Sequence, residues 1–132
     1  MRIIPTRVHG MLDYGVGLLL ILSPWIFQFD DAANRAAVWV PVALGVGALL
    51  YSLMTRYELG VVPVIPMSTH LVLDIASGIF LAASPWLFGF ADDVKWPHVI
   101  FGLLEIGAGL MTRTTPSHIR DATHGHAHPA AH

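Results

Sequence analysis

The sequence predicts an all-α, polytopic membrane protein whose four transmembrane helices form two tandem two-helix repeats in parallel orientation. Three observations carry this prediction: the scarcity of charge, four long apolar segments, and an internal repeat. Of the 132 residues, 55% are hydrophobic and 12% are charged, whereas a soluble domain carries about 25% charged residues. Because so few charges cannot cover the surface of a small water-soluble globule, we expect the chain to lie in a membrane.

The chain contains four apolar segments, at residues 6–23, 36–55, 67–84 and 96–112. At about 1.5 Å per residue each helix would be about 25–30 Å long, close to the thickness of the hydrocarbon layer. Backbone groups in lipid must be satisfied within the segment, which favours helices over loops. Small residues would let the helices approach closely; they are Gly15, Gly17, Ala43, Gly47, Gly78, Gly107 and Gly109.

An octapeptide is written twice: LSPWIFQF at residues 22–29 and ASPWLFGF at 83–90, 61 positions later. The same offset pairs the first histidine and aspartate of each half, and beyond the octapeptide the offset falls to 57. There the Met-Thr-Arg that ends at Arg56 matches the one that ends at Arg113. Repeats of this period indicate duplicated supersecondary units. We therefore divide the chain into a first repeat (1–58), a second repeat (59–114) and a His-rich cytoplasmic tail (115–132) that we expect to be disordered.

The distribution of positive charge predicts the orientation. A repeat with two spans puts both Ser-Pro-Trp sequences on one side of the membrane, and cytoplasmic flanks are enriched in Lys and Arg. Only Arg35 and Lys95 flank the Ser-Pro-Trp side, beside Asp30, Asp31, Asp92 and Asp93. The opposite side carries Arg2, Arg7, Arg56, Arg113 and Arg120. This asymmetry predicts a cytoplasmic (inner) membrane protein with both termini in the cytoplasm.

The repeated octapeptide predicts a helix break. Proline is unfavourable inside a helix but favourable at its first position after a serine N-cap. Ser23-Pro24 and Ser84-Pro85 are therefore expected to end one helix and begin a short new one. The new turn would present aromatic side chains at the membrane interface. The expected anchors are Trp25, Phe27, Phe29, Trp86, Phe88 and Phe90, together with Trp39 and Trp96 at the start of the returning helices. A ligand-binding aromatic box is the alternative.

The doubled Ser-Pro-Trp sequence, with its matched histidines and aspartates, resembles the SPW-repeat family of small integral membrane proteins. The resemblance covers about residues 4–113 and includes both copies of the motif. It implies a multi-pass membrane location. It implies no reaction, substrate or catalytic residue, so the function has to be argued from the residues themselves.

Polar residues inside the spans form the first candidate site. His9 and Asp13 are four residues apart on one helix face, and His70 and Asp74 repeat this arrangement. One hypothesis is a structural clasp, in which the aspartates pair with Arg56 and Arg113 at the ends of the partner helices. Each histidine would then bond its own aspartate or a nearby carbonyl.

The same polar residues also support functional hypotheses, because ionisable groups within the membrane are costly. The two His/Asp pairs could relay protons or bind a divalent ion. In a third hypothesis His9 and His70 ligate a haem b from its two axial sides. No other cofactor and no dedicated metal site is predicted.

Glu105 interrupts the repeat, since Ala48 occupies the equivalent position. A carboxylate near the middle of a span is expected either to be protonated and bonded to a neighbouring helix, or to serve proton coupling or a partner subunit.

The remaining features narrow the function classes. His98 is expected at the interface, and His124, His126, His128 and His132 in the tail predict weak metal binding at most. The sequence has no phosphate-binding glycine loop, no zinc-protease helix and no basic stripe for nucleic acid. We therefore expect a non-catalytic accessory subunit or small homo-oligomer with a membrane-protein partner, the alternatives being an ion channel or transporter and a haem b electron carrier.

Overall fold

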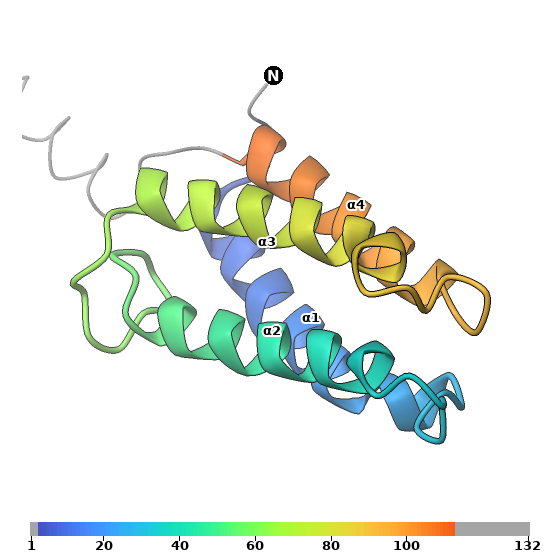
Figure 1. Ribbon diagram of the computed structural model, residues 1–132. Helices are drawn as coiled ribbons and strands as arrows, with labels where there is room; N and C mark the ends of the chain where they lie inside the picture. The colour runs from blue at the N-terminus through green and yellow to red at the C-terminus, as the bar shows by residue number, and fades with distance from the viewer. Residues whose placement is uncertain (1–2, 113–132) are drawn as a thin grey trace, which may run out of the picture.

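The computed structural model describes residues 3–112 and shows four helices: α1 (Thr6–Ile26), α2 (Ala36–Leu53), α3 (Met67–Leu87) and α4 (Trp96–Met111). In Figure 1, α1 pairs with α2 and α3 pairs with α4, and α1 and α3 run in the same direction. Helices α1, α2 and α3 are long and apolar enough to cross a membrane, and α4 is a shorter apolar helix of 16 residues. The predicted all-α membrane fold, with two parallel repeats, is confirmed.

Glycine contacts bring the two helices of each repeat together. A Cβ atom on Gly45 would lie 2.6 Å from the carbonyl oxygen of Gly17, and one on Gly102 would lie 2.5 Å from that of Gly78. Such backbone proximity is typical of helix pairs in membranes, where small residues gain dispersion contacts that lipid cannot supply. Of the glycines predicted to act in this way, Gly17, Gly78 and Gly109 do so, whereas Gly15, Gly47 and Gly107 face open space.

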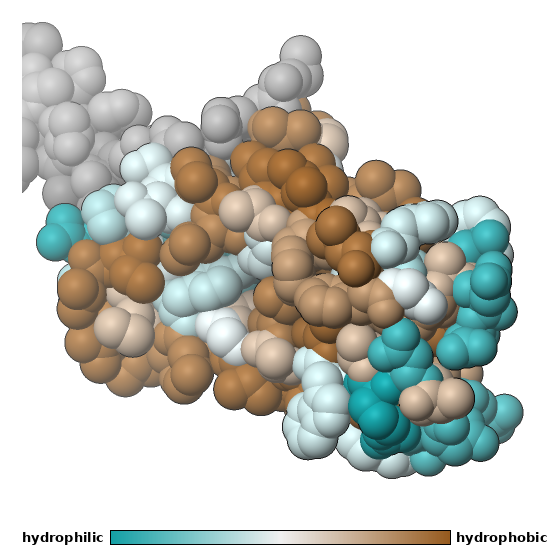
Figure 2. All heavy atoms as spheres, viewed as in Figure 1, coloured by the Kyte–Doolittle hydropathy of each residue, from teal (hydrophilic) through white to brown (hydrophobic). Residues whose placement is uncertain are grey.

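One residue from each helix forms the apolar core between the repeats: Leu20, Val40, Leu81 and Phe101. Most large apolar side chains of the helices point outward instead, and Figure 2 shows apolar surface along the helices. Hydrophilic surface gathers at the end where α1 joins α2 and α3 joins α4 (Figures 1 and 2). This is the pattern of a bundle whose sides meet lipid and whose end meets water.

The predicted helix break at the Ser-Pro sequences is wrong, because α1 continues through Pro24 to Ile26 and α3 through Pro85 to Leu87. Pro24 has no N–H for the carbonyl of Leu20, four residues earlier. The hydroxyl of Ser23 donates to that carbonyl instead, at 2.8 Å. In the second repeat the hydroxyl of Ser84 donates to the carbonyl of Leu81 at 2.6 Å. The serine is thus no N-cap: it restores the hydrogen bond that the proline removes.

The aromatic part of the motif divides into exposed and buried side chains. Just after α1, Gln28 has a positive φ of 59°, and the amide of Phe29 donates to the carbonyl of Pro24 at 2.7 Å, so that the helix ends in a Schellman motif. Gly89 and Phe90 repeat this geometry. The turn carries Phe29 and Phe90 into the core, so the prediction that these two are interface anchors is wrong. The four tryptophans are all more than half exposed, as expected of anchors.

His98 is also buried, contrary to its expected place at the interface. Its Nε2–H donates to the carbonyl of Ala37 on α2 at 2.8 Å, and its ring lies between those of Phe29 and Phe90, with centroids 5.1 and 4.8 Å away. His98 on α4 therefore contacts both α2 and the ends of both Ser-Pro-Trp motifs. It is a contact between repeats that the internal alignment does not show, because Pro41 occupies the equivalent position of the first repeat.

Candidate functional site

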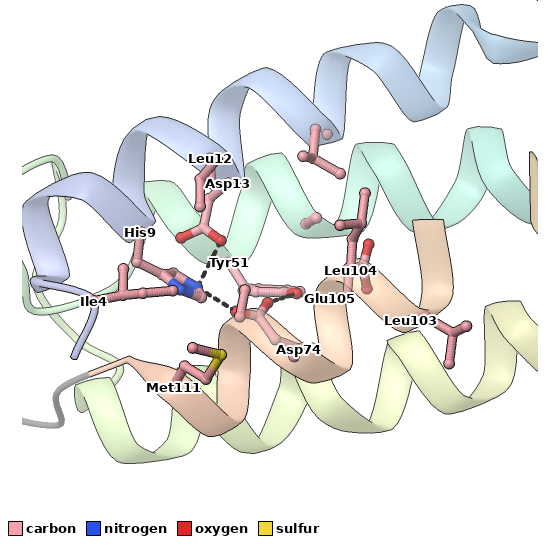
Figure 3. A pocket seen from close by; sticks show the side chains of 15 residues that line it. Ile4, His9, Leu12, Asp13, Tyr51, Asp74, Leu103, Leu104, Glu105 and Met111 are labelled. Carbon is pink, nitrogen blue, oxygen red and sulfur yellow. Dashed lines mark hydrogen bonds and ion pairs between the residues drawn. The ribbon is translucent and has the colours of Figure 1, made fainter. Parts of the chain in front are cut away.

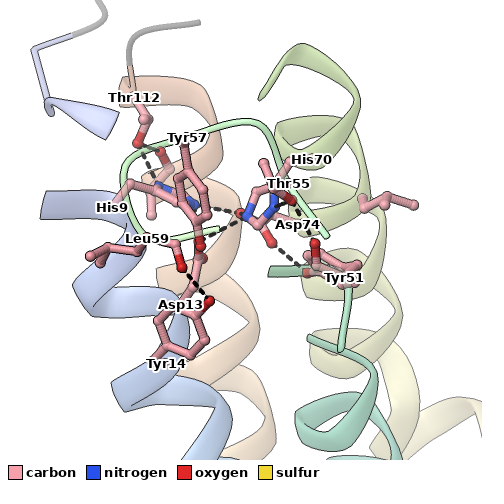
Figure 4. A network of polar contacts seen from close by, with 12 residues as sticks. His9, Asp13, Tyr14, Tyr51, Thr55, Tyr57, Leu59, His70, Asp74 and Thr112 are labelled. Carbon is pink, nitrogen blue, oxygen red and sulfur yellow. Dashed lines mark hydrogen bonds and ion pairs between the residues drawn. The ribbon is translucent and has the colours of Figure 1, made fainter. Parts of the chain in front are cut away.

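Four ionisable side chains meet at the opposite end of the bundle and form what we call the His–Asp cluster: His9, Asp13, His70 and Asp74 (Figure 4). The Nε2 atom of His9 lies 2.9 Å from Asp13 and 2.6 Å from Asp74. The Nε2 atom of His70 lies 2.9 Å from Asp13 and 3.2 Å from Asp74. Each histidine thus contacts the aspartate of its own helix and that of the other repeat.

A threonine from the other repeat holds each histidine. Nδ1 of His9 lies 2.7 Å from Oγ1 of Thr112, and Nδ1 of His70 lies 2.6 Å from Oγ1 of Thr55. The backbone follows the same exchange, since Ile4 bridges to Thr112 and Ile65 to Thr55. The start of each repeat is therefore joined to the end of the other, around a pseudo-twofold axis.

The threonine hydroxyls fix which histidine nitrogen carries a proton. Oγ1 of Thr55 donates to the carbonyl of Tyr51 at 2.6 Å, and Oγ1 of Thr112 donates to the carbonyl of Ala108 at 2.5 Å. Each threonine oxygen can then only accept from the histidine, so Nδ1 bears hydrogen in both rings. Nε2 is left to face the carboxylates. With a proton on each Nε2, two imidazolium rings balance two carboxylates and the cluster is neutral overall.

Two tyrosines complete the polar network. The hydroxyl of Tyr51 on α2 donates to Asp74, and that of Tyr57, in the loop between the repeats, donates to Asp13 at 2.9 Å. Burial, and next the charge of Asp13, raise the pKa of Tyr57, so its hydroxyl stays protonated and remains a donor. Each of the four residues of the cluster therefore contacts at least one side chain outside its own helix.

The clasp hypothesis is wrong about Arg56, which does not pair with either aspartate. Arg56 is exposed, and its Nε donates to the carbonyl of Pro63 at 3.3 Å. The ion pairs of Asp13 and Asp74 within residues 3–112 are with the two histidines. Arg113 lies outside the described residues. Histidine replaces arginine here because the side chain of His9 or His70 reaches the aspartates from within the bundle, whereas Arg56 follows the end of α2 and turns to the loop.

A cavity of about 330 Å³ adjoins the cluster (Figure 3). His9, Asp13, Asp74 and Glu105 all line it, and the other lining residues are mostly apolar. Glu105 projects from α4 into this space, and its Oε2 is buried with no hydrogen-bond partner in the described part of the chain. The expectation that Glu105 bonds a neighbouring helix is therefore not met at this oxygen.

Sequence reasoning missed the threonines and tyrosines of the network. Thr55 and Thr112 had a visible signal, because both belong to the repeated Met-Thr-Arg sequence. Tyr51 had none, because Ala108 stands at the equivalent position, and Tyr57 lies in a loop that has no counterpart among the described residues.

The cluster does not provide the geometry of a haem site. The rings of His9 and His70 are 5.5 Å apart and meet edge to face. Their Nε2 atoms already face carboxylate oxygens at 2.6–3.2 Å. A porphyrin between the two rings would have to displace both aspartates, which leaves the haem hypothesis without geometric support.

The structure is that of a small membrane protein with internal pseudo-twofold symmetry. It consists of a duplicated helical hairpin whose two copies are joined by buried polar residues and whose outer surface is apolar. The chain belongs to the SPW repeat domain family, whose model matches residues 7–112. No curated protein and no solved structure gives a significant match.

Proposed function

We propose that the chain is a non-catalytic, multi-pass module of the cytoplasmic membrane, acting as an accessory subunit of a larger membrane complex or as a small homo-oligomer. The observation that carries this proposal is that the buried ionisable side chains of the cluster pair with one another. His9, Asp13, His70 and Asp74 are paired with one another across the repeats. Side chains committed in this way hold a scaffold together, and the apolar outer surface is left for lipid and protein neighbours.

The loops support the same proposal. Residues 27–35 and 88–95 join the helices of each repeat and are too short to build a water-facing active site. In the proposed topology all four helices cross the membrane, and these loops face away from the cytoplasm.

Native mass spectrometry of the protein, extracted from its own membranes in mild detergent, tests the proposal. A stoichiometric partner or a defined homo-oligomer is expected. A monomer without any partner, obtained under conditions that preserve known complexes from the same membranes, would contradict it.

Topology is testable separately because the chain has no cysteine. Single substitutions Asp92→Cys and Val61→Cys place a thiol in an exposed loop at each end of the bundle. An impermeant maleimide added to intact cells should label the first variant and should label the second only after permeabilisation. The reverse pattern would overturn the proposed orientation.

A proton or ion pathway is the second candidate, and Glu105 is the observation that favours it. Its unpartnered oxygen shares the cavity with three members of the cluster. In proteoliposomes, Glu105→Gln should abolish a pH-driven flux seen for the wild type while leaving assembly intact. Equal flux in both proteins and in empty liposomes would remove this candidate.

A further inference from the structure

The potential ligand atoms of the His–Asp cluster lie close together. One atom from each of His9, Asp13, His70 and Asp74 can be chosen so that all four lie within 4.8 Å of one another. Two imidazole nitrogens and two carboxylate oxygens form a donor set that suits first-row transition metals. We propose that the His–Asp cluster is a binding site for one divalent transition-metal ion of the Zn²⁺ type, a role that does not depend on the accessory function proposed above.

The threonines prepare both histidines for such an ion. Because Thr55 and Thr112 accept the Nδ1 hydrogens, Nε2 is the nitrogen of each ring that is turned toward the carboxylates and could ligate an ion. Histidines that ligate metals almost always donate their other N–H to an outer partner, which fixes the tautomer and the ring orientation. Here each outer partner comes from the opposite repeat and is itself held by a helix carbonyl.

Nε2 of His70 is an independent indication. The side chain is fully buried, and Nε2 lies 2.9 and 3.2 Å from carboxylate oxygens. Yet it makes no hydrogen bond of acceptable geometry within residues 3–112. The nitrogen is thus aimed into the space between the oxygens rather than at either of them, where a shared ion would satisfy it.

The distances are close to those of a tetrahedral site. With zinc–ligand bonds of about 2.0–2.1 Å, neighbouring ligand atoms lie about 3.4 Å apart. The nitrogen–oxygen distances of the cluster are 2.6–3.2 Å. His9 and His70 face different oxygens of Asp13, so a single ligand oxygen of Asp13 leaves three of these pairs within an ångström of the tetrahedral spacing. The four ligand atoms together lie within 4.8 Å of one another.

Charge is also compatible with a divalent ion, which would take the place of the two Nε2 protons and leave the cluster neutral. Two aspartates and two neutral histidines carry a charge of −2, which one such ion neutralises. A neutral centre is the least costly within a membrane. Within residues 3–112, the other ionisable side chains around the cluster are Tyr14 on α1 (Figure 4), Tyr51 on α2, Tyr57 and Glu58 in the loop, and Glu105 on α4.

The cavity gives the ion a route to the cluster. His9, Asp13 and Asp74 line it, and it is not fully enclosed. Mg²⁺ prefers six oxygen ligands and retains several waters, so the mixed nitrogen and oxygen set should discriminate against it.

Binding of Co²⁺ and Zn²⁺ to the purified full-length protein in detergent tests the proposal. Because the five tail histidines also offer ligands, the reference protein has them replaced by Gln: His118, His124, His126, His128 and His132. One equivalent of Co²⁺ should produce the intense visible bands of tetrahedral coordination, and Zn²⁺ but not Mg²⁺ should remove them. X-ray absorption of the zinc form should show two imidazole nitrogens and two oxygens. This test leaves the cluster itself unaltered. The proposal is overturned if the spectra show octahedral Co²⁺ alone, or if no stoichiometric binding is found.

A pair of threonine variants separates the site from general stability. Thr55→Val should lower the affinity for Zn²⁺ by about 10–100-fold, the usual effect of losing an outer partner of a ligating histidine. Thr69→Val is the matched control, because Thr69 is exposed on α3. Unchanged affinity in a folded Thr55→Val protein would contradict the proposed role of the threonines, and equal losses in both variants would contradict the site.

Discussion

The helices within each repeat and the two repeats themselves are held together by different chemistry. Inside a repeat, backbone meets backbone at Gly17 and Gly45 or at Gly78 and Gly102. Between the repeats an apolar core is joined by the His–Asp cluster at one end and by His98 at the other. In lipid, apolar side chains gain little by leaving the solvent, so close packing and polar contacts must supply the attraction. Close packing builds the hairpins, and polar contacts set how the two hairpins meet.

The largest expected effect comes from breaking the contact between repeats. Asp74→Asn keeps the size of the side chain but removes a charge that faces both histidines. Losing one partner of a buried ion pair costs about 3–5 kcal/mol. Unfolding with a denaturing detergent, followed by circular dichroism, should show this loss.

Asp13→Asn should be measured by the same unfolding experiment, because Asp13 and Asp74 occupy equivalent positions in the two repeats. Both variants should lose stability to a similar extent. A loss of less than about 1 kcal/mol for Asp74→Asn would mean that the cluster does not hold the repeats together.

Packing within a repeat should give the next largest effect. In Gly102→Ala the new Cβ would lie 2.5 Å from the carbonyl oxygen of Gly78 and 2.6 Å from the amide nitrogen of Ala82. Since backbone atoms cannot yield cheaply, we expect a loss of about 1–3 kcal/mol. Gly107→Ala on the same helix is the control, because a Cβ there meets nothing within 4 Å. The close-packing account fails if both variants are equally stable.

The Ser-Pro pair predicts a smaller loss. Ser84→Ala leaves the carbonyl of Leu81 without the hydrogen bond that replaces the one removed by Pro85, which should cost about 1 kcal/mol. Ser77→Ala is the matched control. Its hydroxyl also donates to a carbonyl of α3, that of Leu73, but no proline deprives that carbonyl of its helical partner. Similar losses for the two serines would show that Ser84 has no special role beside the proline.

Glu105→Gln should have the smallest effect on stability, within about 0.5 kcal/mol, because one carboxyl oxygen of Glu105 has no hydrogen-bond partner among the described residues. Thermal unfolding in the same detergent measures it. A loss above about 2 kcal/mol would assign Glu105 to the scaffold and not to the cavity.

The fold could be predicted from the sequence because it rests on patterns that repeat. Four apolar segments and the recurring Ser-Pro-Trp gave four helices in two parallel hairpins. The paired His and Asp positions correctly pointed to a polar site, since parallel repeats place equivalent residues at one end of the bundle.

What the sequence could not predict was which groups meet in space. The charge of Arg56 suggested a partner for Asp13, but the arginine turns into the loop and histidine supplies the contact. The preference of Ser-Pro for helix starts concealed a second use of the same two residues inside a helix. His98 has no repeated counterpart, so its burial depends on packing that no pattern reveals.

A double-mutant cycle between His9 and Asp74 tests most directly whether the cluster joins the repeats. The two residues belong to different repeats, and His9 Nε2 lies 2.6 Å from Asp74 Oδ2. We expect the free energies of unfolding of wild type, His9→Gln, Asp74→Asn and the double variant to give a coupling of about 1–3 kcal/mol. Losses that add to within about 0.5 kcal/mol would show that the two side chains act independently and would contradict the account.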